Sequence, residues 1–155
     1  MSLEYRTGDL LDAPVRAIAH GCNARGNMGA GLSRAIATRY PAVRAAYEQA
    51  HATSGLTLGQ VIWVDTGDRL VANCITQQTY GRVPGQRYVS YDAVRACMAS
   101  LDAYAAEHGL AEIGLPLIGA GLAQGHWPTI AAIIAEEARH FRPLVYTLDG
   151  VIPSA

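Results

Sequence analysis

Two glycine-rich segments constrain the fold of this chain more than any other feature. The first, HGCNARGNMGAGL, follows the apolar run from Val15 to His20, and the second, PLIGAGL, follows the run from Glu112 to Pro116. A nearly continuous apolar run is typical of a strand that is covered on both faces of its sheet. Each glycine segment leads into an amphipathic helical pattern. This order of strand, glycine loop and helix predicts an α/β fold with the loops at the carboxyl ends of strands.

The remaining patterns extend this alternation along the chain. Apolar positions three or four apart predict helices at 31–41, 42–52, 91–108 and 127–141. Further strands are predicted at 3–7, 60–65, 69–76 and 143–148. The short Thr66-Gly67-Asp68 connection predicts a hairpin, and Ser90 and Gly109 suit the two ends of the third helix. We therefore expect one domain over residues 1–155, with a three-layer α/β/α fold around a central mixed sheet.

The composition excludes several classes of protein. All twelve basic residues are arginine, and the 155 residues include no lysine. The chain therefore has no side-chain amine for a Schiff base and no P-loop lysine for a phosphate. A net charge of −1 gives no footprint for a nucleic-acid backbone, and no apolar run has the length of a membrane span. The three cysteines lack metal-site spacing and fit a reducing compartment, so we expect a cytoplasmic protein without a metal.

The glycine loops are suited to an anionic ligand. Glycine allows backbone N–H groups to approach a ligand closely, and a helix N-terminus beside them carries partial positive charge. Two such loops can hold a diphosphate without lysine, although either loop alone is equally explained as a tight turn. The spacing does not match the G-x-G-x-x-G motif of dinucleotide dehydrogenases. The acidic residue at the required distance, Glu48, falls in a predicted helix.

The segments TGDLL, AHGCN, NMGAGLSRAI and LPLIGAGL occur in this order, and with them the chain resembles the macrodomain family of ADP-ribose-binding modules. The resemblance covers nearly the whole chain. AHGCN together with MGAGL is most similar to the branch that contains terminal ADP-ribose protein glycohydrolase and the DarG antitoxin. It implies a macrodomain-like fold whose partners are ADP-ribose and ADP-ribosylated proteins, with no cofactor.

The resemblance also implies which residues contact ADP-ribose. Asp9 would accept a hydrogen bond from the adenine amino group, with Leu10 beside it, and Asn23 would lie at the distal ribose. The two glycine loops would surround the diphosphate and distal ribose, through Gly29, Ala30, Gly31, Gly119, Ala120, Gly121 and Leu122.

Two positions depart from the pattern of this branch. Its members carry a catalytic lysine where this chain has Gln77, and an aspartate where it has Ala123. Hydrolysis would then be independent of lysine, with water attacking the C1″ carbon through an oxocarbenium-like state that the diphosphate stabilises. The candidates to orient or activate this water are Asn23, Gln77, Gln78, Tyr80, His20 and His126. His20 ends a predicted buried strand, so a purely structural role remains the alternative for it.

The expected reaction is the release of ADP-ribose from glutamate or aspartate esters of modified proteins, because these bonds are labile. Two alternatives stay open within the same family: a phosphatase acting on ADP-ribose 1″-phosphate, and a binding module without activity. A glycine-loop protein that binds another nucleotide is a third. The sequence determines neither the oligomeric state nor the modified target.

Overall fold

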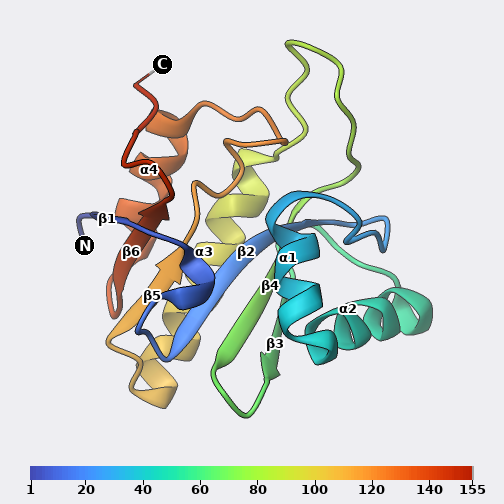
Figure 1. The fold of residues 1–155 in the computed structure, drawn as a ribbon, viewed down its shortest axis with the longest axis horizontal. Helices are drawn as coiled ribbons and strands as arrows, with labels where there is room; N and C mark the ends of the chain where they lie inside the picture. Colours follow the sequence, from blue (N-terminus) through green and yellow to red (C-terminus); the bar gives the residue numbers. More distant parts are fainter. Residues whose placement is uncertain (155) are drawn as a thin grey trace.

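A computed structural model describes residues 1–154, and in this range six strands form one sheet flanked by four α-helices (Figure 1). The strands are β1 (Glu4–Thr7), β2 (Ala17–Asn23), β3 (Val61–Asp65), β4 (Leu70–Gln77), β5 (Glu112–Leu115) and β6 (Arg142–Thr147). The helices are α1 (Gly31–Arg39), α2 (Pro41–Ser54), α3 (Tyr91–His108) and α4 (Trp127–Glu137), with a short 3₁₀ helix at Leu10–Asp12.

The sheet has the strand order β1-β6-β5-β2-β4-β3. Every neighbouring pair is parallel except β3 and β4, which pair antiparallel with Asp65 opposite Leu70. This pair confirms the predicted hairpin and makes the sheet mixed. Because β2, β4 and β5 are parallel neighbours, their carboxyl ends lie at one edge of the sheet. Both glycine loops and the connection after β4 begin at this edge (Figure 1).

Helices cover both faces of the sheet, which confirms the three-layer α/β/α fold. Helices α1 and α2 pack against β2, β3 and β4 on one face, while α3 and α4 form the opposite layer. Strand β2 lies inside the sheet, with a helix layer on each face, and six of its seven residues are buried. This position explains its continuous apolar run. Among residues 1–154, no helix combines the length and apolar character required to cross a membrane.

The ends of α3 agree with the sequence prediction because local signals determine them. The hydroxyl of Ser90 accepts a hydrogen bond from the Ala93 backbone N–H at 3.1 Å, which caps the first turn. Gly109 ends the helix in the left-handed conformation with φ of 67°. A glycine adopts this conformation without steric penalty.

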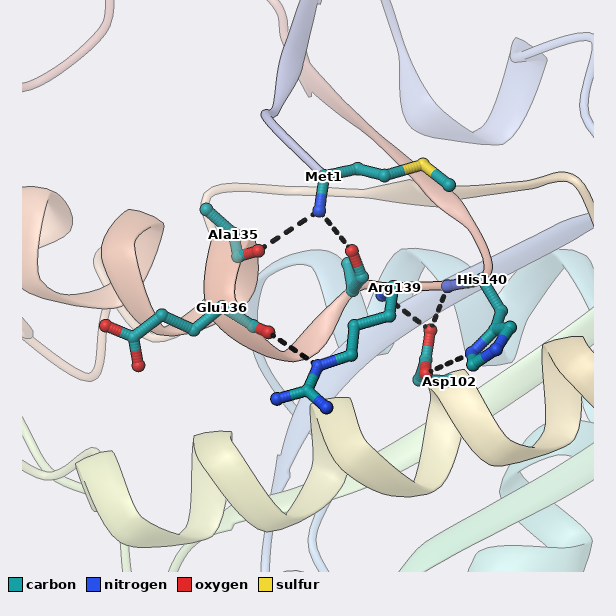
Figure 2. Close-up of polar contacts among 7 residues, drawn as sticks. Met1, Asp102, Ala135, Glu136, Arg139 and His140 are labelled. Carbon is teal, nitrogen blue, oxygen red and sulfur yellow. Dashed lines mark hydrogen bonds and ion pairs between the residues drawn. The ribbon is translucent and has the colours of Figure 1, made fainter.

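Two boundaries differ from the prediction by three residues or more, while others shift by one or two. Strand β2 continues to Asn23 instead of ending at His20, because it stays paired with β4 as far as Gln77. Helix α4 ends at Glu137 instead of continuing to Phe141. The cause is Asp102 on α3, whose carboxylate accepts the backbone N–H groups of residues 139 and 140 at 2.8 and 2.6 Å and the ring Nδ1–H of residue 140 at 2.8 Å (Figure 2). These bonds hold the chain in a non-helical path toward β6.

Candidate functional site

A cavity of about 620 Å³ opens at the carboxyl ends of β2, β4 and β5. Three segments surround it: the first glycine loop (residues 24–30), the β4–α3 loop (78–90) and the second glycine loop (116–126). Its volume is in the usual range of small-molecule sites. The position outside the strand ends is the one where open α/β sheets bind their ligands. The cavity is therefore the candidate functional site.

Asn23 shapes the first glycine loop. Its side-chain oxygen accepts a hydrogen bond from the Arg25 N–H at 2.9 Å, and its Nδ2 donates to the Asn27 carbonyl at 2.7 Å. The Tyr47 hydroxyl donates to the Asn23 backbone carbonyl and also lies 3.0 Å from the Asn23 side-chain oxygen. Burial raises the pKa of Tyr47, so this hydroxyl remains a donor. The Asn23 amide thus fixes the loop and keeps one N–H for a ligand or a water molecule.

Tyr80 connects the β4–α3 loop to the first glycine loop. Its hydroxyl oxygen accepts a hydrogen bond from Asn27 Nδ2 at 2.8 Å, and the Asn27 oxygen accepts from the Gly29 N–H at 2.7 Å. The O–H proton of Tyr80 therefore remains available to donate at the cavity. Gln77 also lines the cavity, and its Nε2 donates to the Thr79 carbonyl at 2.8 Å, which leaves its oxygen to accept.

The second glycine loop folds back on itself. The Gly125 N–H donates to the Gly119 carbonyl at 2.7 Å, and Gly119 has a φ of 78°. The side chain of Gln124 accepts from the Gly85 N–H at 3.2 Å and donates to the Val83 carbonyl at 2.9 Å. Through these two bonds Gln124 holds the β4–α3 loop against the second glycine loop. The two sides of the cavity are therefore fixed relative to each other.

The electrostatics of the cavity favour an anion. Helix α1 begins beside it, and no side chain caps the first-turn N–H groups of that helix. These groups carry the partial positive charge of a helix N-terminus. Within the described part of the chain, Arg82 is the single charged side chain in the cavity lining, and no carboxylate lines it. The site can hold a phosphate or diphosphate through backbone N–H groups and one guanidinium.

The structure brings most of the predicted site residues together. The cavity lining contains Asn23, Gly29, Ala30, Gly31, Gln77, Tyr80, Gly119, Gly121 and Leu122. Ala120 lies in the second glycine loop without lining the cavity.

Asp9 and Leu10 lie apart from this cavity. Asp9 is exposed, and its carboxylate accepts the Leu11 N–H at 2.9 Å; Leu10 is buried. A second hollow of about 460 Å³ shares Gly31 with the cavity and extends to Leu11 and Arg34. A ligand that spans both hollows can therefore reach the neighbourhood of Asp9.

His20 is not part of the cavity lining. It is 1 % exposed, with Nε2 at 2.5 Å from Asn73 Oδ1 and Nδ1 at 3.0 Å from Ser33 Oγ. Burial lowers its pKa to about 4, and the hydrogen bond to Asn73 offsets only part of this effect. Both ring nitrogens of His20 therefore have hydrogen-bond partners inside the protein. Sequence reasoning missed Ser33 and Asn73, although an asparagine within the apolar run LVANCI was a usable signal.

Fold and cavity together define an α/β protein with a candidate ligand site at the carboxyl ends of its parallel strands. The Macro domain family model matches residues 19–134, and the chain belongs to this family.

Curated relatives and solved structures agree with this assignment. A "DNA ADP-ribosyl glycohydrolase" from Mycobacterium tuberculosis is 29 % identical over 132 residues, which are 83 % of this chain and 36 % of the relative. The chain therefore spans little more than a third of that protein. The "ADP-ribose glycohydrolase OARD1" from Bos taurus is 26 % identical over 94 % of this chain and 91 % of its own length. The DarG macrodomain of Thermus aquaticus superimposes with a TM-score of 0.80 at 26 % identity, covering 94 % of this chain and 97 % of that one.

Proposed function

We propose that this protein binds ADP-ribose in the 620 Å³ cavity and releases it from glutamate or aspartate esters of modified proteins. The observation that carries the proposal is the cavity itself, where two glycine loops and an uncapped helix N-terminus meet without any carboxylate among the described lining residues. The names of the relatives add support, since both describe glycohydrolases of ADP-ribosyl groups. The partners are accordingly ADP-ribose and ADP-ribosylated proteins, and residues 1–155 act as one domain.

The diphosphate binds along the second glycine loop and the start of α1, where backbone N–H groups face it. The adenosine part extends through the second hollow toward Asp9 and Leu10, and the distal ribose lies beside Asn23. This placement leaves the ester at the end of the cavity that Gln77 and Tyr80 form. It uses every predicted ligand residue except Ala120, whose role is limited to the course of the loop.

Hydrolysis proceeds without a lysine and requires water. Neither Gln77 nor Ala123 can form a covalent amine intermediate or transfer a proton. Neutral groups orient the reactants instead: the Tyr80 O–H donates, the Gln77 oxygen accepts, and one Asn23 N–H contacts the ribose. Positioning of this kind can lower a barrier by several of the roughly 7–11 kcal/mol that orientation supplies.

Two alternatives have specific support. Arg82, the one charge among the described lining residues, favours a second anionic group and thus ADP-ribose 1″-phosphate as substrate. The replacement of lysine and aspartate by Gln77 and Ala123 favours a binding module without activity.

The test combines binding with turnover. Calorimetric titration with ADP-ribose, AMP, NAD and inorganic phosphate measures ligand choice, and ADP-ribose is expected to bind most tightly. A glutamate-ADP-ribosylated peptide and ADP-ribose 1″-phosphate are then incubated with the protein, and free ADP-ribose and phosphate are measured. Tight binding with no product from either substrate would leave the binding module as the function. Absence of ADP-ribose binding would refute the site.

A further inference from the structure

Three side chains form a continuous hydrogen-bonded chain from the core to the cavity. The parallel pairing of β2 with β4 places His20 opposite Asn73, and their side chains meet at 2.5 Å. Ser33, in the first turn of α1, contacts the other nitrogen of the imidazole at 3.0 Å. Ser33 lines the cavity, whereas His20 and Asn73 are buried behind it.

The hydrogen bonds of Asn73 determine which nitrogen of the His20 ring carries the proton. Asn73 Nδ2 donates to the Val43 carbonyl at 3.2 Å, which directs its oxygen toward His20. The asparagine oxygen can only accept, so His20 carries its proton on Nε2. Nδ1 is then unprotonated, and it is the nearer of two acceptors for the Ser33 hydroxyl proton, at 3.0 Å against 3.2 Å for the Gly21 carbonyl. Serine, base and orienting amide thus stand in the order required for an activated nucleophile.

We propose that Ser33 is a nucleophile, with His20 as its base and Asn73 as the residue that positions the imidazole. This inference rests on the proposed function and specifies the group that attacks the ester and the bond that breaks. Compared with the serine protease arrangement, the imidazole is reversed, since Nδ1 faces the serine.

The reaction has two halves and requires no oxidant or metal. Ser33 Oγ attacks the ester carbonyl carbon and passes its proton to His20 Nδ1. The bond between the acyl carbon and the ribose oxygen breaks, and that oxygen takes the proton, so ADP-ribose leaves and the acyl group stays on Ser33. Water then attacks the acyl-serine, again giving its proton to His20, which returns it to Ser33 as the carboxylic acid departs.

The surroundings of His20 keep it in the base form. Burial holds the pKa of His20 near 4, so the imidazole is neutral at pH 7. The titratable group beside it is Cys22, whose sulfur lies 3.7 Å from Nε2, and burial raises the pKa of this thiol. Ser33 from α1 and Asn73 from β4 contact the two ring nitrogens, and neither side chain titrates. The expected activity is therefore constant from pH 8 to about pH 5 and falls as His20 protonates.

Hydrolysis in ¹⁸O-labelled water identifies the bond that breaks. The substrate is the glutamate-ADP-ribosylated peptide, and mass spectrometry reads the peptide carboxylate, because the anomeric hydroxyl of ribose exchanges with water. Attack by Ser33 places the label in the carboxylate. Attack of water at C1″ leaves the carboxylate unlabelled, which overturns the inference while the proposed function stands. Absence of ADP-ribose release by the wild-type protein overturns the proposed function, and the inference falls with it.

Variants of Ser33 supply the second readout. Ser33→Ala is expected to lower ester hydrolysis by at least about 100-fold and to leave ADP-ribose affinity unchanged. Ser33→Cys retains a nucleophile, so it is expected to keep part of the activity and to become inactivated by iodoacetamide at residue 33. Ser100→Ala, at an exposed position of α3, is the matched control and keeps full activity. Wild-type rates in Ser33→Ala would overturn the inference.

Asn73 is tested by a pH profile. Asn73→Asp retains the acceptor and adds a negative charge beside the imidazole, which raises the pKa of His20. The acid limb of the activity profile is then expected to move to higher pH. An acid limb that keeps its position in Asn73→Asp would show that activity does not depend on the protonation of His20, and it would refute the role of His20 as the base.

Discussion

Gly119 and Gly121 provide a matched pair that separates ligand binding from folding. A Cβ atom built on Gly121 meets no atom within 4 Å, and Gly121 is not among the residues with positive φ. Because Gly121 lines the cavity, the methyl groups of Gly121→Val occupy space next to the second glycine loop that we assign to the diphosphate. The substitution is therefore expected to block the ligand without disturbing the fold.

The magnitudes follow from the two environments. The Cβ of Gly121→Val meets neither backbone strain nor a clash, so the unfolding free energy of the variant should remain within about 0.5 kcal/mol of the wild type. Loss of one hydrogen bond from a backbone N–H to a charged phosphate removes about 1.5–3 kcal/mol. This corresponds to a dissociation constant for ADP-ribose that is roughly 10- to 100-fold higher.

Gly119→Ala is expected to behave in the opposite way. Its φ of 78° is in the left-handed region, and the added Cβ would lie 2.7 Å from Val89 Cγ2 and 3.1 Å from Ile130 Cδ1. Left-handed backbone costs about 1–2 kcal/mol for a residue with a side chain, and overpacking adds about 1–3 kcal/mol. The expected loss of stability is therefore about 2–5 kcal/mol.

Urea unfolding without ligand and calorimetric titration with ADP-ribose measure both quantities for each variant. Wild-type affinity in Gly121→Val would show that the second glycine loop does not contact the diphosphate. Destabilisation of Gly121→Val as large as that of Gly119→Ala would show that the loop conformation differs from the one described, and the reasoning would then fail at its first step.

Three further predictions concern residues on different sides of the molecule. Asp9→Asn keeps an acceptor for the Leu11 N–H, so the turn should stay intact. Because the neutral amide accepts more weakly than the carboxylate from the adenine amino group, titration should show weaker binding of ADP-ribose but unchanged binding of ribose 5-phosphate. Tyr80→Phe removes the free O–H and should lower kcat by about tenfold or more with little change in KM. Asp102→Ala should lower the unfolding free energy by about 2–4 kcal/mol at pH 7 and leave ADP-ribose binding intact. Burial acts to raise the pKa of Asp102, but the hydrogen bonds from residues 139 and 140 outweigh it and hold that pKa low. The stabilisation is therefore complete above about pH 4, the value for an unfolded aspartate, and urea unfolding should show it decline as the pH falls further.

The sequence predicts the elements of this fold well because their signals are local. Helix α3 has apolar positions three or four apart, a serine at its start and a glycine at its end, and all of these lie within one segment. Strand β2 likewise has a continuous apolar run because helices cover both of its faces. The alternation of such segments is sufficient to predict the three layers.

Boundaries that depend on distant residues could not be predicted. The early end of α4 results from hydrogen bonds to Asp102, which is 37 and 38 residues away in the sequence. The contacts of His20 with Ser33 and Asn73 likewise join residues that are distant in the sequence. The contact with Asn73 depends on the register of the parallel β2–β4 pair, and no hairpin turn fixes such a register in the sequence. The candidate site was therefore predictable as two glycine loops, but the groups behind it were not.

The buried position of His20 suits the negative charge of the proposed ligand. A carboxylate base in the cavity would repel a bound diphosphate, and the described lining contains none. A base that serves an anionic substrate here must be neutral at working pH and must not compete with the loops for the phosphates. His20 satisfies both conditions, since burial keeps its imidazole uncharged and Ser33 separates it from the cavity. The same burial makes the imidazole a weak base, so turnover should be slow and confined to activated esters. A stable ether or guanidine linkage should then resist this protein, whereas a carboxylic ester should not.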